Sequence, residues 1–172
     1  MSLPDSSLRA RAPSFSEHEF RGALGMFATG VTIVTARTAQ GALVGLTANS
    51  FNSVSLEPPL VLWSLRGASP NLVAFVAASH FTVNVLAESQ IDLSRRFASP
   101  VHDRFAGADW QPGLGGAPVL SGCAAVFQCA SDKHLPMGDH MLFIGRVLAV
   151  ADAALPPLVF QAGHYHQLGR TL

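Results

Sequence analysis

The chain has 172 residues, of which 49% are hydrophobic and only 13% charged, and its 11 basic residues are balanced by 11 acidic ones. This length fits one domain with a substantial core, and the charge balance argues against a nucleic-acid surface because no basic cluster is longer than Arg95 and Arg96. So little charge favours an oligomer with a buried subunit interface over a monomer with a neutral, apolar surface.

The two ends of the chain and its two cysteines indicate its domain organisation and its cellular compartment. Residues 1–13 have no periodicity and are interpreted as a flexible leader to a single domain formed by residues 14–172. No signal peptide and no long apolar run are present, so a cytoplasmic protein is expected. Cys123 and Cys129 are expected in one strand, about 20 Å apart, as buried free thiols and not as a disulfide.

The first predicted element is a helix that begins at Ser14 or Ser16 and ends near residues 29–30. Its apolar residues Phe20, Leu24, Phe27 and Ala28 recur on one face, which core packing would explain completely. Residues 31–35, 42–46 and 60–65 are then predicted to be strands.

Between the second and third of these strands lies a polar strip, residues 47–55. It contains five short polar side chains in nine positions, namely Thr47, Asn49, Ser50, Ser53 and Ser55. Such a strip leaves backbone N–H groups accessible and suits a ligand rich in acceptors, such as a phosphate ester or a flavin ring. The alternative is a connection that forms hydrogen bonds only with itself.

A turn leads from the third strand into a second helix, predicted at residues 71–78 with Ser69 as its N-cap. Arg66, Ser69 and Asn71 lie where this helix starts beside a strand end, a place suited to an anion. These three residues would bind a phosphate; in the alternative, they only cap the helix and the arginine is exposed to solvent. A strand at 80–86 and a helix at 90–98 follow.

Residues 99–119 are predicted to be a long loop, either a functional lid or a segment anchored to the core by Trp110. Strands at 122–130, 139–150 and 158–160, the last extending toward Tyr165, complete the chain. At least six strands without βαβ alternation predict a mainly β protein, a closed antiparallel barrel with a few peripheral helices. No GxGxxG motif supports a Rossmann nucleotide site.

Seven histidines raise the question of a metal site, but their spacing matches no metal-binding motif, and none is expected. His140 differs from the others because it follows Gly138 and Asp139 at the start of a strand. This group is either a polar strand start or part of a binding site.

Four segments in this order resemble the flavin reductase-like family, the reductase components of two-component flavin-dependent monooxygenases. They are residues 20–35, residues 47–62 (TANSFNSVSLEPPLVL), residues 80–88 and residues 138–147. The resemblance covers residues 15–169. It implies a split β-barrel of the FMN-binding type, a homodimer, and hydride transfer from NADH or NADPH to FMN or FAD, which then leaves for a separate monooxygenase.

The resemblance also implies a set of site residues. His140 is implied as the catalytic residue that positions the nicotinamide, and residues 103–105 and 109–110 resemble the family's excursion toward the flavin. The implied cofactor-binding residues are Thr47, Ala48, Asn49, Ser50, Ser53, Val54, Ser55, Arg66, Ser69, Asn71, Gly138, Asp139, His140 and Tyr165.

The C-terminal segment departs from the family, because residues 161–167 carry imidazoles where the family commonly has an arginine-rich segment. The choice between NADH and NADPH therefore stays open. The choice between FAD and FMN also stays open, because the isoalloxazine ring and the first phosphate would meet the same residues in both. Two alternative functions also stay open: a reductase that retains its flavin and acts on a corrinoid or a ferric chelate, and a non-catalytic flavin-binding protein.

Overall fold

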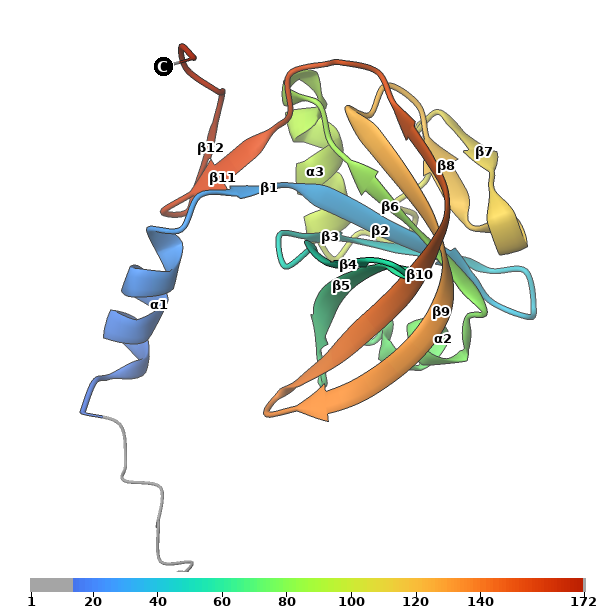
Figure 1. Ribbon diagram of the computed structural model, residues 1–172, viewed down its shortest axis with the longest axis horizontal. Coiled ribbons are helices and arrows are strands. Elements are labelled where there is room, and N and C mark those ends of the chain that lie inside the picture. The colour runs from blue at the N-terminus through green and yellow to red at the C-terminus, as the bar shows by residue number, and fades with distance from the viewer. Residues whose placement is uncertain (1–13, 172) are drawn as a thin grey trace, which may run out of the picture.

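The computed structural model describes residues 14–171, so the predicted leader lies outside the described residues. A seven-stranded antiparallel sheet in the order β3-β2-β6-β9-β10-β5-β4 curls into a split barrel (Figure 1). Its strands are β2 (Thr32–Arg37), β3 (Leu43–Ala48), β4 (Asn52–Leu56), β5 (Pro59–Arg66), β6 (His80–Val85), β9 (Ala125–Met137) and β10 (His140–Asp152).

Two small sheets and three helices surround the barrel. One sheet joins β1 (Thr29–Gly30), β11 (Val159–Gln161) and β12 (His164–His166), and the other pairs β7 (Trp110–Pro112) with β8 (Pro118–Leu120). The helices are α1 (Glu17–Gly25), α2 (Leu72–Ala77) and α3 (Ile91–Ala98), with short 3-10 turns η1 (Glu88–Gln90) and η2 (Leu114–Gly116). The predicted mainly β barrel with peripheral helices is confirmed.

The core has two parts, one on each side of β2. In the first, Trp63 of β5 stacks on Phe143 of β10 with ring centroids 4.4 Å apart, and Phe75 of α2 meets Trp63 edge-on. The second part contains Phe97 of α3. Because side chains alternate along a strand, Val34 packs in the first part and Ile33 in the second. β2 is thus buried on both faces.

A glycine lets α3 pack tightly on the barrel. A Cβ atom at Gly45 of β3 would lie 2.7 Å from Cε1 of Phe97 and 3.1 Å from Cζ of Phe105. Any side chain at this position would push the helix away from the strand. Gly45 therefore fixes how closely the end of α3 approaches the residues that follow β3.

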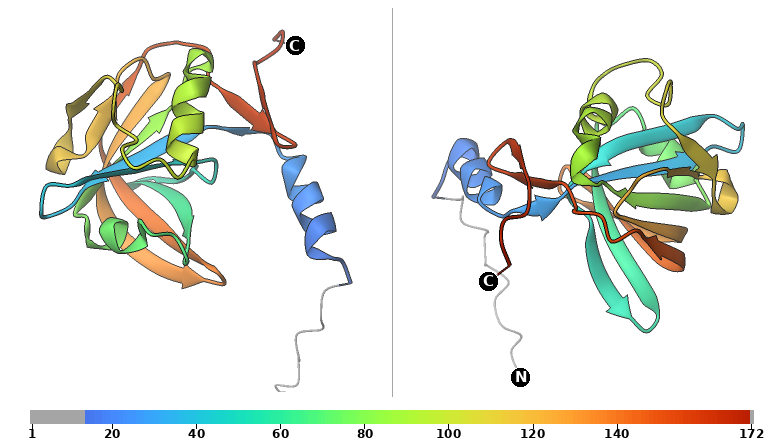
Figure 2. Two further views of the ribbon diagram at one scale, coloured as in Figure 1. Left: turned by 180° about the vertical axis from the view of Figure 1, so that it is seen from behind. Right: turned by 90° about the horizontal axis from the view of Figure 1, so that it is seen from above.

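The structure corrects the prediction for the first helix. Ser16 caps α1 as predicted, with its hydroxyl accepting from Glu19 N, but the helix ends at Gly25 and none of its residues is buried. Figure 2 shows α1 standing away from the barrel. Phe20, Leu24 and Phe27 are 50%, 57% and 75% exposed. The core packing expected for this apolar face within the chain is wrong.

Other boundaries also differ from the predictions. Asn52–Leu56 forms strand β4, and part of the expected loop forms the β7–β8 pair. Asn71, not Ser69, is the N-cap of α2. Cys123 precedes β9 and lies in the second core part, whereas Cys129 lies in the first; both are buried and free, as expected. No helix in the described range is long and apolar enough to cross a membrane.

Candidate functional site

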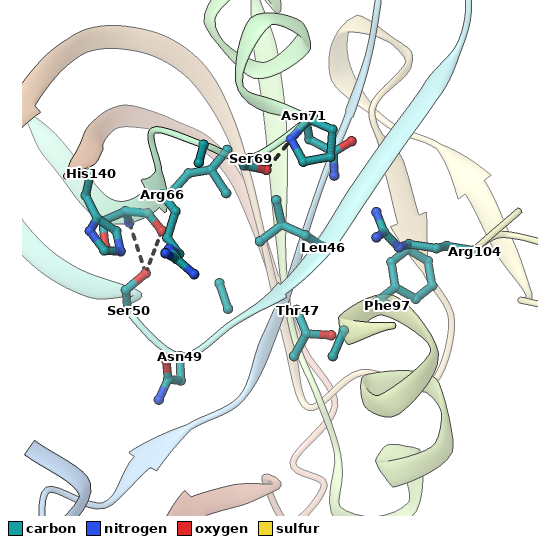
Figure 3. Close-up of a pocket in the computed structure, with 16 residues that line it drawn as sticks. Leu46, Thr47, Asn49, Ser50, Arg66, Ser69, Asn71, Phe97, Arg104 and His140 are labelled. Atoms are coloured by element: carbon teal, nitrogen blue, oxygen red, sulfur yellow. Dashed lines mark hydrogen bonds between the residues drawn. The ribbon is translucent and has the colours of Figure 1, made fainter. Parts of the chain in front are cut away.

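A pocket of about 610 Å³ opens where β3, β5, β10 and the end of α3 meet (Figure 3). The described residues that line it come from five separate stretches of the chain, and none of them is acidic. They are Leu46, Thr47, Ala48, Asn49, Ser50, Ser64, Leu65, Arg66, Ala68, Ser69, Pro70, Asn71, Phe97, Ala98, Arg104 and His140.

Ser50 holds the polar strip against β5. Its hydroxyl donates to the carbonyl oxygen of Ser64 over 3.1 Å and accepts from Ser64 N over 3.0 Å. In the β4–β5 register, Asn52 pairs with Leu62, so Ser50 is in line with Ser64, two residues before β4 begins. The side chain of Ser50 thus takes the place of a backbone partner at the position where the chain leaves the sheet.

This departure from the sheet frees backbone donors beside the pocket. Among the described residues, neither Asn49 N nor Ser50 N donates a hydrogen bond. Thr47 is fixed by a 2.7 Å hydrogen bond from its hydroxyl to the carbonyl oxygen of Ser94 in α3. The strip therefore presents uncharged N–H donors from a segment held at both ends, which suits a planar ligand rich in acceptors.

Arg66, Ser69 and Asn71 form a second group in the pocket wall. Ser69 Oγ accepts from Asn71 N over 3.3 Å, which folds the turn before α2 around the pocket. Arg66 ends β5, and its Cα pairs with that of His140 on the neighbouring strand. The cation of Arg66 and the two small polar side chains together can bind a phosphate group.

His140 stands beside Arg66 at the start of β10. Its Nδ1 lies 2.8 Å from Oδ1 of Asp139, so this nitrogen donates the hydrogen when the carboxylate is ionised. This hydrogen bond, followed by the positive charge of the protonated imidazole, lowers the pKa of Asp139. Because Nδ1 is engaged, Nε2 is the ring atom of His140 that is left for a ligand.

The predicted site residues do not all meet in this pocket. Thr47, Ala48, Asn49, Ser50, Arg66, Ser69, Asn71 and His140 line it. Ser53, Val54 and Ser55 lie on β4 and do not, whereas Gly138 and Asp139 form the turn between β9 and β10. Gly138 has φ of +60°, which favours glycine.

Tyr165 lines a neighbouring cavity of about 190 Å³ that shares Thr47, Asn49 and Ala98 with the main pocket. Its hydroxyl is 2.8 Å from Ser94 Oγ. The backbone carbonyl of the same serine accepts from Thr47, so Ser94 links the two cavities.

The implied set did not include Leu46, Ser64, Leu65, Ala68, Pro70, Phe97 and Ala98. Arg104 was also outside that set, but it lies in the segment 103–105 that the resemblance linked to the flavin. Phe97 had an apolar helical period, which predicts core burial, and it is indeed only 1% exposed.

Trp110 anchors the loop after α3, because Phe105 packs between Trp110 and Phe97 with ring centroids 6.1 and 5.0 Å away. In the part of the chain that the structure describes, no group of three metal-ligating side chains is present.

Comparisons with known proteins agree with this geometry. Residues 24–169 match the family model described as flavin reductase like domain. The chain is 47% identical over 154 residues to a probable flavin reductase of Rhizobium meliloti (strain 1021), a match that covers 90% of this chain and 50% of that protein. The chain therefore spans about half the length of this relative.

Two other relatives are covered over most of their length. FMN reductase (NADH) SmoA of Agrobacterium fabrum (strain C58 / ATCC 33970) is 43% identical over 155 residues, covering 90% of this chain and 88% of SmoA. The flavin-dependent monooxygenase reductase subunit HsaB of Mycobacterium tuberculosis (strain ATCC 25618 / H37Rv) is 40% identical over 149 residues, covering 85% and 79%.

A solved structure has the same fold. It is the NADH:FAD oxidoreductase SgcE6 of Streptomyces globisporus C-1027 in complex with NAD and FAD fragments, with a TM-score of 0.84 and 35% identity. The match covers 88% of this chain and 92% of that one. The chain belongs to the flavin reductase-like domain family.

Proposed function

We propose that this protein is an NAD(P)H:flavin oxidoreductase that reduces FMN or FAD and supplies reduced flavin to a separate monooxygenase. The observation that carries the proposal is that one pocket combines the uncharged strip at Asn49 and Ser50, the cation of Arg66 and the imidazole of His140. Family membership and relatives named as flavin reductases and a monooxygenase reductase subunit support it.

In this proposal, the polar strip binds the ring of the flavin and the turn before α2 binds its phosphate. The free N–H groups of Asn49 and Ser50 fit the acceptor edge of an isoalloxazine ring, where preorganised donors stabilise the negative charge of reduction. Arg66, Ser69 and Asn71 fit the flavin phosphate. Ser53, Val54, Ser55 and Tyr165 have no direct contact in this arrangement of the main pocket.

Flavin, when bound, supplies the chemistry, because its N5 accepts a hydride from C4 of the nicotinamide. The protein binds and orients both molecules, and the hydride step needs no protein acid or base. His140 is the residue proposed to position the nicotinamide nucleotide, through the ring nitrogen that does not contact Asp139. Asp139 holds the ring orientation, and Gly138 forms the turn that presents it.

The lining of the pocket also fits a flavin that exchanges. The strip contributes uncharged contacts in this arrangement. A reductase that delivers reduced flavin to another protein needs such reversible binding.

The free, buried cysteines fit a reducing compartment, and we infer a cytoplasmic location.

We further propose that the protein is a homodimer in which α1 packs against the second copy. Phe20 and Leu24 of α1, together with Phe27 just after it, expose a large apolar area, and no residue of α1 is buried among the described residues. Leu148 and Val150 of β10, 52% and 68% exposed, add apolar surface on the barrel. Burying these residues in a symmetric interface would remove them from water.

Sedimentation tests the dimer. The wild type is expected to sediment as a dimer, and the double variant with Phe20→Glu and Leu24→Glu as a monomer. The pair Glu17→Gln and Arg21→Gln, which changes the ion pair on the same helix, is the control and leaves the dimer intact. A monomeric wild type would refute the proposal.

The activity is tested by following NADH and NADPH oxidation with riboflavin, FMN or FAD added in turn to the purified protein. Oxidation that requires added flavin supports a reductase with exchangeable flavin. Oxidation only with copurified flavin and an added corrinoid or ferric chelate would support the retained-flavin alternative. Flavin binding without any nicotinamide oxidation would contradict the proposed activity.

A further inference from the structure

Arg104 enters the pocket from the side opposite to Arg66, with Leu46 and Thr47 between them (Figure 3). It comes from the loop after α3, about forty positions from Arg66 along the chain. Its guanidinium group is held by two backbone carbonyl groups. Nη1 donates to the carbonyl oxygen of Gly45 over 3.1 Å, and Nε and Nη2 donate to that of Ser99 over 3.1 and 2.9 Å.

The charge of Arg104 is not neutralised within the described residues. No described carboxylate lies within 4 Å of its nitrogens. The neighbouring carboxylate, Asp103, instead accepts hydrogen bonds from the backbone N–H groups of Phe105 and Ala106. A guanidinium group has five N–H donors, and the carbonyl groups take three of them. A half-buried cation with two free donors therefore faces the pocket.

The proposed reaction brings two phosphate-bearing molecules into this pocket at once. A nicotinamide dinucleotide carries a diphosphate, and FMN or FAD carries its own phosphate groups. Arg66, Ser69 and Asn71 form one anion-binding group, which accounts for one phosphate. Arg104 stands apart from that group, so a second phosphate has a separate cation available.

We propose that Arg104 is a phosphate-binding residue for a phosphate group other than the one held by Arg66, Ser69 and Asn71; this inference rests on the proposed function. Guanidinium groups bind phosphate oxygens through paired N–H donors. The carbonyl groups of Gly45 and Ser99 fix the plane of the Arg104 side chain, so little conformational freedom is lost on binding. The second phosphate belongs either to the adenylate half of FAD or to the diphosphate of the nicotinamide dinucleotide.

Equilibrium binding to Arg104→Gln separates these sources. Dissociation constants are measured for riboflavin, FMN and FAD by flavin fluorescence, and for NAD⁺ by calorimetry on the riboflavin-loaded protein. Loss of the charged contact is expected to weaken one ligand by roughly tenfold or more. Weakening of FAD alone assigns Arg104 to the second flavin phosphate, and weakening of NAD⁺ alone assigns it to the nicotinamide dinucleotide.

Two further variants separate binding from structure. Arg104→Lys keeps the charge and is expected to recover part of the lost affinity. Arg96→Gln is the matched control, because Arg96 donates to the carbonyl oxygen of Ala106 in the same loop and does not line the pocket. It is expected to leave all four dissociation constants unchanged.

The inference is overturned if Arg104→Gln leaves all four ligands unaffected, if it weakens riboflavin as much as FAD, or if it weakens FMN and FAD equally. The second result would mean that Arg104 only shapes the pocket, and the third that it binds the first phosphate. These measurements need no turnover. A wild type that binds flavin but oxidises no nicotinamide nucleotide would contradict the proposed activity. The dissociation constants of the Arg104 variants would still show whether Arg104 binds a phosphate group.

Discussion

Replacing Ser50 by alanine tests whether the hydroxyl of Ser50 holds the backbone of the polar strip in the conformation that binds flavin. The hydroxyl of Ser50 satisfies both Ser64 N and the carbonyl oxygen of Ser64, at a position two residues before β4 begins. Ser50→Ala leaves both backbone groups of a partly buried strand without their partner. Because water reaches part of this site, we expect a loss of about 1 kcal/mol in the free energy of unfolding.

The larger effect of Ser50→Ala is expected on flavin binding. Without the hydroxyl, the backbone at Asn49 and Ser50 is no longer held in the bound conformation and must be ordered by the ligand. Fixing the backbone of one residue costs about 1–2 kcal/mol. The dissociation constant for flavin should therefore rise by about tenfold, since each 1.4 kcal/mol corresponds to about a factor of ten.

Urea unfolding and flavin fluorescence measure the two effects on the same preparations. Ser53→Ala is the matched control, since Ser53 is exposed on β4 and lies outside the pocket. It should change neither quantity. An unchanged flavin dissociation constant in Ser50→Ala, or an equal change in Ser53→Ala, would refute the idea that Ser50 preorganises the strip.

Three further predictions concern other parts of the chain. His140→Ala should raise KM for the nicotinamide nucleotide and leave flavin affinity nearly unchanged in steady-state kinetics and flavin titration, and an unchanged KM would remove this residue from the site. Gly45→Val should force Phe97 away from β3, lower the free energy of unfolding in urea by about 1–3 kcal/mol and weaken flavin binding; wild-type values for both would contradict the close packing. Burial raises the pKa of Cys123 to about 11 and that of Cys129 to about 12, so both should react slowly with a thiol reagent at pH 8 and rapidly in urea; fast reaction of the folded protein would show that a thiol is accessible.

Local pattern was enough to predict much of this protein. Alternation of apolar residues located the strands that became β2, β3, β5 and β6, and the missing βαβ pattern predicted the barrel. The sequence also showed the polar strip at residues 47–55, of which residues 47–50 line the pocket, and the turn with Arg66, Ser69 and Asn71. Each of these groups lies in one short contiguous segment, so its polar side chains are close together without contacts from other parts of the chain.

Contacts between distant segments were not available from the sequence. The apolar face of α1 predicted packing against the core of its own chain, but no residue of α1 is buried in the structure. Phe97 and Arg104 reach the pocket only because Gly45 lets α3 pack tightly on β3, which brings residues about fifty positions apart together.

The division between the two kinds of information has a physical cause. Hydrogen bonding along a strand and the period of apolar residues depend on neighbours in the chain, so the sequence by itself determined the strands, the barrel class and the polar strip. Which face of the strip is open and how Arg66, Arg104 and His140 come to line one pocket depend on packing across the barrel. Only the tertiary structure decided these, because the register of β4, β5 and β10 brings Ser50 and His140 beside β5, and the loop after α3 brings in Arg104.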